Sequence, residues 1–240
     1  MTPFGRDPRL SRHPLKARVP LPDDAPVAAM WNRIGGLLTR AGKIAGLEPA
    51  AMLAVWMVEC GGLPFIKGKP VLRFEAHVFF ARWGERNEAL FDEHFRFGGR
   101  QGIEGAKWQN HAMRSTGEWR RFHGDQSLEY EAFRLAAKLA GLETACQCAS
   151  FGGPQIMGFN HALVGYSAAA EMFRAFGRSE RWQVLAFFDF CKGKDILDAL
   201  RTQDWMRFAT VYNGPGNAAA YAEKIAAAHD AARQMLKDRA

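Results

Sequence analysis

The chain lacks any segment that could cross a bilayer as a helix. None of its 240 residues belongs to an apolar run of about 18, which is the length a membrane span requires. The first ten residues, MTPFGRDPRL, also lack the apolar core of a secretory signal. We therefore expect a protein made in the cytoplasm without a signal peptide and without stable membrane insertion. A substrate outside the cytoplasm would then depend on a separate delivery route.

Cysteine is scarce, and the usual zinc motifs are missing. Cys60, Cys146, Cys148 and Cys191 lie in apolar or helical stretches, where they resemble buried small hydrophobic residues more than a disulfide framework. The chain has seven histidines, but neither a His-Glu-x-x-His motif nor a paired Cys-x-x-Cys motif accompanies them. A zinc hydrolase is therefore disfavoured, and we predict no metal and no cofactor.

Recognisable nucleic-acid motifs are also missing, although the chain is basic. The formal net charge is +7 and the isoelectric point is about 9.4, which indicates an anionic partner. Lys and Arg are scattered, and the densest basic stretches, 6–18 and 114–121, carry no helix-turn-helix or RNA-binding signature. Charge alone leaves nucleic acid, a membrane surface and an acidic cell-wall polymer open. Because these signatures are absent, we predict no nucleic-acid partner.

The patterning that is present is mainly helical. With 48% apolar residues, the chain can bury one substantial core, and we find no internal repeat or low-complexity segment. Residues 1–25, rich in Pro, Arg and Asp, predict an N-terminal arm, and 26–240 predict one main domain. Helices are predicted at 26–42 or 26–46, 49–59, 127–140, 165–177, 180–192, 194–200, 203–211 and 217–237.

The sequence predicts few extended segments. Residues 69–75 predict a short extended segment, and the aromatic-rich 77–83 fits either a helix or a strand. Residues 96–124, rich in Gly, His, Asn and Gln, predict long loops and short helices along a cleft. Ser127 is the predicted N-cap of the helix that follows. The fold class is therefore mainly α, with at most a small β element.

Glu59 is the most informative single residue. It ends the apolar run PAAMLAVWMV and is followed at once by Gly61 and Gly62, so its helix should end within a residue or two. Desolvation and the negative end of a helix both raise the pKa of a carboxyl group. A carboxylic acid that stays protonated near neutral pH is the group needed to break a glycosidic bond.

Three further stretches contain polar residues suited to a glycan. SFGGPQIMGFN, ending at Asn160, places Gly153 and Gln155 in a glycine-rich turn whose backbone can approach a ligand. VYNGPGN places Tyr212 and Asn213 in a turn before the last helix. RFEAH places Glu75 as a second carboxylate sixteen residues after Glu59. Taken singly, each has a structural interpretation, such as an Arg73–Glu75 ion pair.

Together, the stretches VECGG, LRFEAHVFF, SFGGPQIMGFNH and VYNGPGN resemble the N-acetylmuramidase family of phage endolysins and bacterial effectors, within the lysozyme-like superfamily. The resemblance covers residues 26–235. It departs from the family pattern at Cys60, where serine is more usual, and at Gly153-Pro154, where Leu-Gly is more usual.

The resemblance implies a lysozyme-like helical domain with its small β element beside the cleft. It implies hydrolysis of the β-1,4 bond between N-acetylmuramic acid and N-acetylglucosamine in peptidoglycan glycan strands. The protein would be monomeric, and a holin or a secretion system would deliver it to the cell wall in the periplasm. Glu59 and Glu75 become the predicted catalytic residues, and the predicted substrate-binding residues are Gly153, Gln155, Asn160, Tyr212 and Asn213.

The sequence leaves several alternatives open. Glu75 could stabilise an oxocarbenium-like state, attack as a nucleophile or activate water, depending on its separation from Glu59. A lytic transglycosylase would use the same acid without a hydrolytic water. A non-catalytic wall-binding module would share the basic charge and the aromatic residues, but it would not need an acid at Glu59.

Overall fold

The fold is mainly α, as predicted, in a computed structural model that describes residues 3–22, 25–61 and 63–238. Gly62 and part of the predicted arm lie outside the described residues. The chain divides into two compact units, of which one comprises 1–64, 163–165 and 179–240, and the other 65–162 and 166–178. We refer to them as unit 1 and unit 2. Among the described residues, no helix combines the length and apolarity needed to cross a bilayer.

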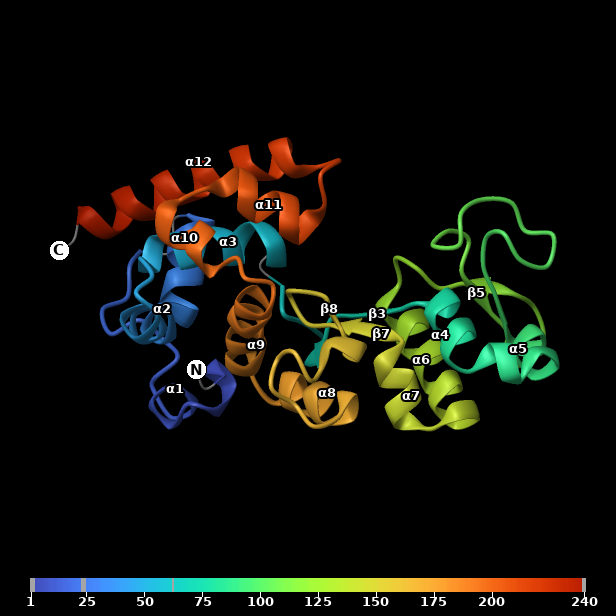
Figure 1. Cartoon of the computed structure of the whole chain (residues 1–240). Coiled ribbons are helices and arrows are strands. Elements are labelled where there is room, and N and C mark those ends of the chain that lie inside the picture. Colours follow the sequence, from blue (N-terminus) through green and yellow to red (C-terminus); the bar gives the residue numbers. More distant parts are fainter. Residues whose placement is uncertain (1–2, 23–24, 62, 239–240) are drawn as a thin grey trace. The chain divides into compact units, whose positions relative to one another are not determined.

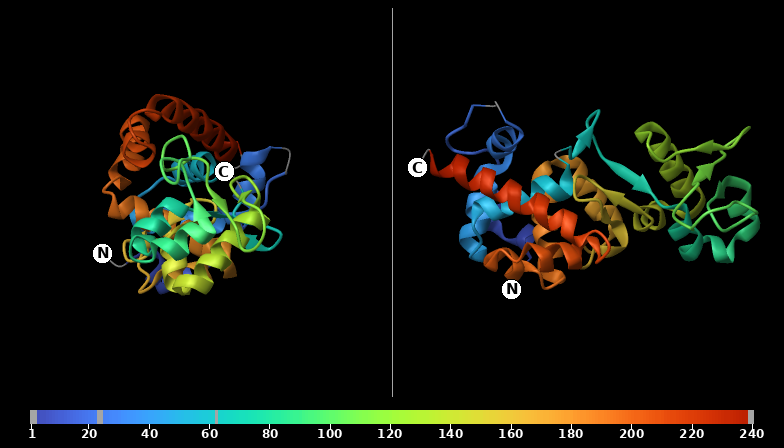
Figure 2. Two further views of the ribbon diagram at one scale, coloured as in Figure 1. Left: turned by 90° about the vertical axis from the view of Figure 1, so that its right-hand side faces the viewer. Right: turned by 90° about the horizontal axis from the view of Figure 1, so that it is seen from above.

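Unit 1 is helical. Its elements are η1 (Phe4–Arg6), α1 (Pro8–Ser11), α2 (Pro26–Ala45), α3 (Pro49–Cys60), α9 (Glu180–Gly193), α10 (Leu197–Thr202), α11 (Trp205–Asn213) and α12 (Ala218–Lys237). α3 contacts both α2 and α12, and α12 also contacts α11 (Figures 1 and 2). Residues 50–56 of α3 are all buried, and Trp56 packs edge-on against Phe187 of α9 with ring centroids 5.7 Å apart. An apolar helix is thus the centre of this core.

The described part of the predicted arm packs against unit 1. Phe4 and Leu10 are buried, and the Asp189 carboxylate accepts the backbone N–H groups of Phe4, at 2.6 Å, and Gly5, at 3.0 Å. Gly36 of α2 allows a close approach, since a Cβ there would lie 2.1 Å from the carbonyl oxygen of Lys16. These contacts attach the N-terminal residues to α9 and α2.

Unit 2 combines short helices with small antiparallel sheets. Its helices are α4 (Ala76–Arg82), η2 (Gly84–Arg86), α5 (Glu88–His94), α6 (Gln126–Ala140), α7 (Leu142–Gln147), η3 (Gly158–Asn160) and α8 (Ala169–Arg178). Its strands are β1 (Phe65–Ile66), β2 (Lys69–Pro70), β3 (Leu72–Phe74), β4 (Phe95–Arg96), β5 (Ala112–Met113), β6 (Arg120–Arg121), β7 (Ala149–Phe151) and β8 (Ile156–Met157).

Three separate sheets result. β1 pairs with β2, and the other two sheets have the orders β3-β7-β8 and β4-β5-β6. Register is fixed by pairs such as Leu72 with Phe151, and Ser150 with Met157. A cluster of buried aromatic rings surrounds Phe74, whose centroid lies 5.6–6.1 Å from those of Phe79, Phe95 and Phe122.

The predicted helices are present with shifted bounds, and α5 and α7 were not predicted. α11 continues to Asn213, so the prediction of a turn at Tyr212 and Asn213 was wrong. Asp125, not Ser127, caps α6, because its carboxylate accepts the N–H groups of Ser127 and Leu128 at 2.7 and 3.1 Å. α8 begins at Ala169 rather than at 165, because the Glu143 carboxylate accepts the N–H groups of Ala169 and Ala170. Residues 96–124 contain loops as expected, but with the short strands β5 and β6 in place of short helices.

Candidate active site

Glu59 lies in the last turn of α3. The helix ends where Gly61 adopts a left-handed conformation with φ +53°, which glycine reaches at little cost. The side chain is half-buried, and burial raises its pKa to about 7, whereas a hydrogen bond from Asn213 lowers it. The net effect is a carboxyl group that changes protonation state near neutral pH.

The end of α11 provides the partners of Glu59. The Asn213 side-chain amide donates a hydrogen bond of 2.8 Å to the Glu59 carboxylate. Tyr212 stacks on Phe208 with ring centroids 5.6 Å apart and contacts Phe187 edge-on. Burial raises the pKa of the Tyr212 phenol, so this group stays neutral. The structure therefore brings together three of the predicted site residues, Glu59, Tyr212 and Asn213.

Two buried thiols flank this carboxyl group. Cys60 and Cys191 are free cysteines, and burial raises the pKa of each thiol well above its ordinary value. A thiol without access to its thiolate form is a poor nucleophile. These two thiols therefore stay protonated beside Glu59 near pH 7.

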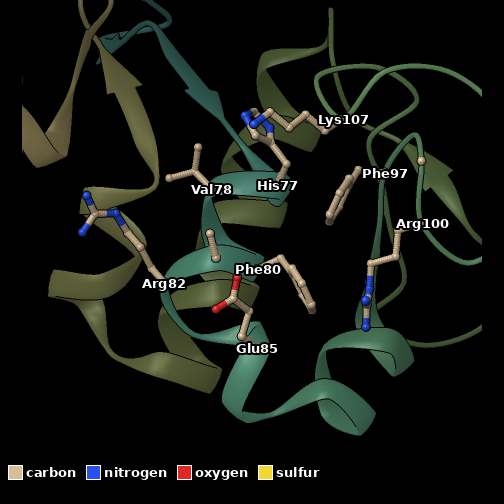
Figure 3. A pocket seen from close by; sticks show the side chains of 10 residues that line it. His77, Val78, Phe80, Arg82, Glu85, Phe97, Arg100 and Lys107 are labelled. Carbon is tan, nitrogen blue, oxygen red and sulfur yellow. The ribbon is translucent and has the colours of Figure 1, made fainter.

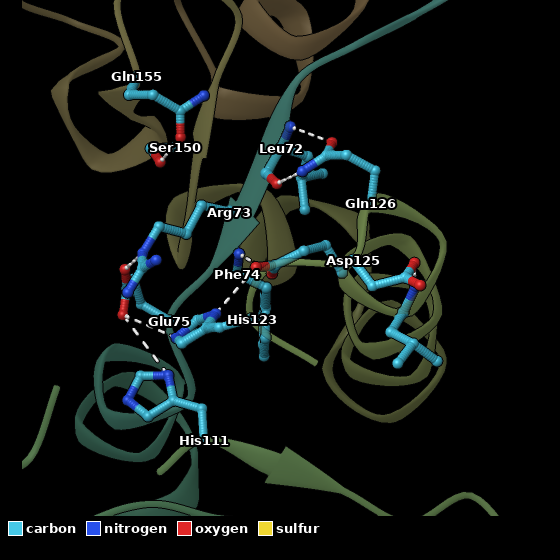
Figure 4. A network of polar contacts seen from close by, with 12 residues as sticks. Leu72, Arg73, Phe74, Glu75, His111, His123, Asp125, Gln126, Ser150 and Gln155 are labelled. Atoms are coloured by element: carbon cyan, nitrogen blue, oxygen red, sulfur yellow. Dashed lines mark hydrogen bonds and ion pairs between the residues drawn. The ribbon is translucent and has the colours of Figure 1, made fainter. Parts of the chain in front are cut away.

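The second predicted carboxylate, Glu75, lies in unit 2 between β3 and α4 (Figure 4). Its Oε1 accepts a hydrogen bond of 2.7 Å from Arg73, so the predicted ion pair is present. Its Oε2 is buried and lies 3.4 Å from Nδ1 of His77 and 3.6 Å from Nδ1 of His111. Nε2 of His123 lies 4.0 Å from the same oxygen.

The three imidazoles are neutral near pH 7. Burial lowers the pKa values of His111 and His123 to about 4, and it lowers that of His77 as well. The other nitrogen of His123 lies 2.8 Å from the carboxyl group of Glu129, which is itself buried. Burial raises the pKa of Glu129 to about 8. Glu75, His111 and His123 each bring a possible ligand atom within 4.8 Å of one another.

The predicted glycan-binding turn lies between β7 and β8 of unit 2 (Figure 4). The Gln155 amide is held within the turn, because its oxygen accepts from Ser150 and its nitrogen donates 2.7 Å to the Gly152 carbonyl. Gly153 is buried, and Asn160 ends η3 half-buried. Gly158 begins η3, where a Cβ would meet the carbonyl oxygen of Cys146 at 1.9 Å.

Unit 2 also contains a pocket of about 660 Å³ (Figure 3). Its walls include His77, Phe80 and Phe97, with the basic side chains of Arg100 and Lys107 at its margin. Sequence patterns did not single out this pocket, nor did they single out His111, His123 or Glu129. The sequence contained one sign of this cluster. Glu75 and His77 are two possible metal ligands separated by a single residue.

Comparison with known proteins identifies the family of this chain. The N-acetylmuramidase family model matches residues 48–233, which is more than half of the chain. The chain belongs to the N-acetylmuramidase family. The crystal structure of Burkholderia AP3 phage endolysin is similar, with a TM-score of 0.64 and 27% sequence identity, and the match covers 82% of this chain and 70% of that one. No curated protein matches.

These relationships confirm the resemblance and the lysozyme-like helical class predicted from the sequence. They support a glycoside hydrolase of the peptidoglycan-degrading type for this member of the family. Within unit 1, the carboxyl group of Glu59 has the surroundings that such chemistry requires of a general acid.

Proposed function

We propose that this N-acetylmuramidase hydrolyses the β-1,4 bond between N-acetylmuramic acid and N-acetylglucosamine, with Glu59 as the general acid. The observation that carries the proposal is the half-buried Glu59 carboxyl group, whose pKa is raised to about 7. A general acid works best when its pKa lies near the working pH, because it must hold a proton and also release it readily.

The proposed step begins with protonated Glu59. Its carboxyl group donates a proton to the oxygen that links the two sugars while the C–O bond breaks and the sugar ring approaches an oxocarbenium-like state. Asn213 fixes the orientation of the carboxyl group and stabilises the carboxylate left after the transfer. Water then adds to the anomeric carbon and loses one proton to solvent, and the Glu59 carboxylate takes up one proton from solvent before the next turnover.

The remaining site residues have separate proposed roles. Tyr212, held by Phe208 and Phe187, shapes the wall beside the acid. Gly153, Gln155 and Asn160 are proposed to form part of the glycan-binding surface, and the internal hydrogen bonds of Gln155 support a role in holding that turn in shape.

Glu75 stays a predicted catalytic residue, because no observation tests its part in the reaction. Its contacts with Arg73 and three imidazoles support the alternative structural role. We therefore assign no chemical step to it here.

Digestion of purified peptidoglycan in ¹⁸O-labelled water tests the reaction. Mass spectrometry of the products should show N-acetylmuramic acid at the new reducing end carrying one ¹⁸O atom. An unlabelled 1,6-anhydro sugar would identify a lytic transglycosylase instead, and N-acetylglucosamine at the reducing end would identify a different bond. Glu59→Gln is the matched control, since it keeps the shape of the side chain and removes the acid.

A further inference from the structure

The surroundings of Glu75 contain an unusual group of unsatisfied polar atoms. Across the part of the chain that the structure describes, five buried side-chain polar atoms have no hydrogen-bond partner, and four of them lie here. They are Oε2 of Glu75, Nδ1 of His77, Nδ1 of His111 and Nε2 of His123. Buried polar groups normally find partners, so a cluster of four that face one another needs an explanation.

The distances from these nitrogens to the carboxylate oxygen are too long for hydrogen bonds. The three imidazole nitrogens lie 3.4, 3.6 and 4.0 Å from Oε2 of Glu75, whereas N–H···O bonds measure about 2.7–3.2 Å. Zinc holds its nitrogen and oxygen ligands at about 2.0–2.2 Å, so neighbouring donors in a tetrahedral site lie about 3.3–3.6 Å apart. Oε2 of Glu75 therefore lies at nearly a co-ligand distance from Nδ1 of His111, and ligand atoms of Glu75, His111 and His123 all lie within 4.8 Å of one another.

In Glu75, His111 and His123, the other polar atom of the side chain has a partner outside the cluster. Nε2 of His111 lies 2.9 Å from the backbone carbonyl of Lys107, and Nδ1 of His123 lies 2.8 Å from the Glu129 carboxyl group. Oε1 of Glu75 accepts from Arg73. Imidazoles and carboxylates that bind a metal usually make such a second contact, which fixes the tautomer and directs the free lone pair inward.

Glu129 completes a carboxylate–histidine arrangement. It accepts the backbone N–H of Phe74 through Oε2, at 2.8 Å, while Oε1 faces His123. A hydrogen bond donated by Nδ1–H of His123 to this carboxylate would leave the lone pair of Nε2 free to bind an ion.

We propose that Glu75, His111 and His123 form a binding site for a divalent transition metal ion, with Zn²⁺ as its preferred occupant. Imidazoles together with one carboxylate suit zinc, whereas Ca²⁺ and Mg²⁺ prefer oxygen ligands. Three protein ligands leave the fourth position of a tetrahedral shell for water or for His77, whose Nδ1 lies 3.4 Å from Oε2 of Glu75.

The location of the ligands indicates what the ion does. Glu75 and His77 come from the β3–α4 junction, His111 directly precedes β5, and His123 follows β6. The side chain of His111 is 0% exposed and that of Glu75 is 13% exposed, so the site lies inside unit 2. A bound ion would join the loop-rich segment 97–122 to β3 and α4. The inference concerns the stability of unit 2 and is independent of the acid role proposed for Glu59.

Metal analysis of untagged protein tests the proposal. The protein is stripped with a strong chelator and titrated with zinc sulfate, and bound metal is measured by mass spectrometry after desalting. We expect one Zn²⁺ per chain and a higher melting temperature in the zinc-bound form. Replacement by Co²⁺ should produce the intense visible absorption of a tetrahedral site.

Variants separate this site from incidental binding. His111→Asn, His123→Gln and Glu75→Gln should each retain less than one tenth of the bound zinc and lose the zinc-dependent rise in melting temperature. His94→Gln is the matched control, because His94 also lies in unit 2, bonded to the backbone carbonyl of Arg114, but outside the cluster. It should bind zinc as the unmodified chain does.

One variant keeps all the proposed ligands, in case a ligand variant fails to fold. Glu129→Gln should weaken zinc binding about 10–100-fold, as expected when the partner of a metal-bound histidine is lost. Glu59→Gln should bind zinc normally, so failure of the proposed reaction would not affect this result. A stripped protein that takes up no stoichiometric zinc, or a double variant His111→Asn/His123→Gln that binds it fully, would overturn the proposal.

Discussion

The carboxyl group of Glu59 opposes folding when it is ionised. In the folded chain its pKa is about 7, against an ordinary value of 4.5, so the folded state binds more protons than the unfolded state between these two pH values. Stability then falls as pH rises from about 4.5 to about 7. A pKa difference of this size corresponds to at most about 3 kcal/mol, and partial exposure of the side chain reduces it.

Glu59→Gln should therefore separate activity from stability. We expect a loss of peptidoglycan-clearing activity of at least about 10²-fold, since the glutamine has no proton to donate. The melting temperature should rise at pH 8, where the unmodified chain carries a buried charge, and should change little at pH 4, where Glu59 is neutral in both states. A variant that keeps more than a tenth of the activity would place the acid elsewhere.

Asn213 should set the pH at which activity declines. Its hydrogen bond stabilises ionised Glu59 and so lowers the pKa of that group. In Asn213→Ala we expect the alkaline limb of the rate profile to move to higher pH. Asn217→Ala is the control, because Asn217 lies in the same turn but is exposed. If the rate declines at the same alkaline pH in Asn213→Ala and in the unmodified chain, Asn213 does not set the pKa of Glu59.

At the scale of secondary structure, the start of α6 offers a direct comparison of two candidate caps. Asp125→Ala removes the side chain that accepts two N–H groups of the first turn, and we expect a loss of about 1 kcal/mol in the free energy of unfolding. Ser127→Ala should cost less than about 0.5 kcal/mol, because Ser127 is inside the helix. Urea denaturation of both variants measures the difference, and equal losses would contradict the assignment of Asp125.

Helix interiors could be predicted from the sequence because apolar spacing and flanking residues specify them locally. α3 begins at Pro49 and ends beside Gly61, so both signals lie at the ends of the helix itself. The start of α8 could not be predicted in this way, because its first N–H groups bind Glu143 from a different helix. The carboxylate lies 26 residues away in the sequence, so the residues around the start of α8 do not indicate it.

The same distinction holds for the site. Glu59 could be selected as a candidate acid because the apolar residues around it are its own sequence neighbours. The histidines around Glu75 could not be grouped, because His111 and His123 reach it only through the pairing of β4, β5 and β6. Asn213 was predicted to bind substrate, and in the structure its side-chain amide donates a hydrogen bond to Glu59. That contact joins two helices far apart in the sequence.

At the scale of the whole molecule, the net charge of +7 should draw the protein to anionic wall polymers. Pelleting with insoluble peptidoglycan should weaken as salt rises from about 0.05 M to about 0.5 M, because screening shortens the reach of surface charge. Glu59→Gln should pellet like the unmodified chain, since attraction does not require catalysis. Binding that is independent of salt would assign recognition to uncharged contacts instead.

The four buried cysteines allow the opening of each unit to be timed separately. Cys60 and Cys191 belong to unit 1, and Cys146 and Cys148 belong to unit 2. All four are free, and burial raises the pKa of each thiol, so an alkylating reagent reacts with them only when the surrounding structure opens. Peptide mapping after timed alkylation would give an alkylation rate at each cysteine. Equal rates at all four positions would indicate that the molecule unfolds as a whole. Different rates for the two pairs would show which unit opens first.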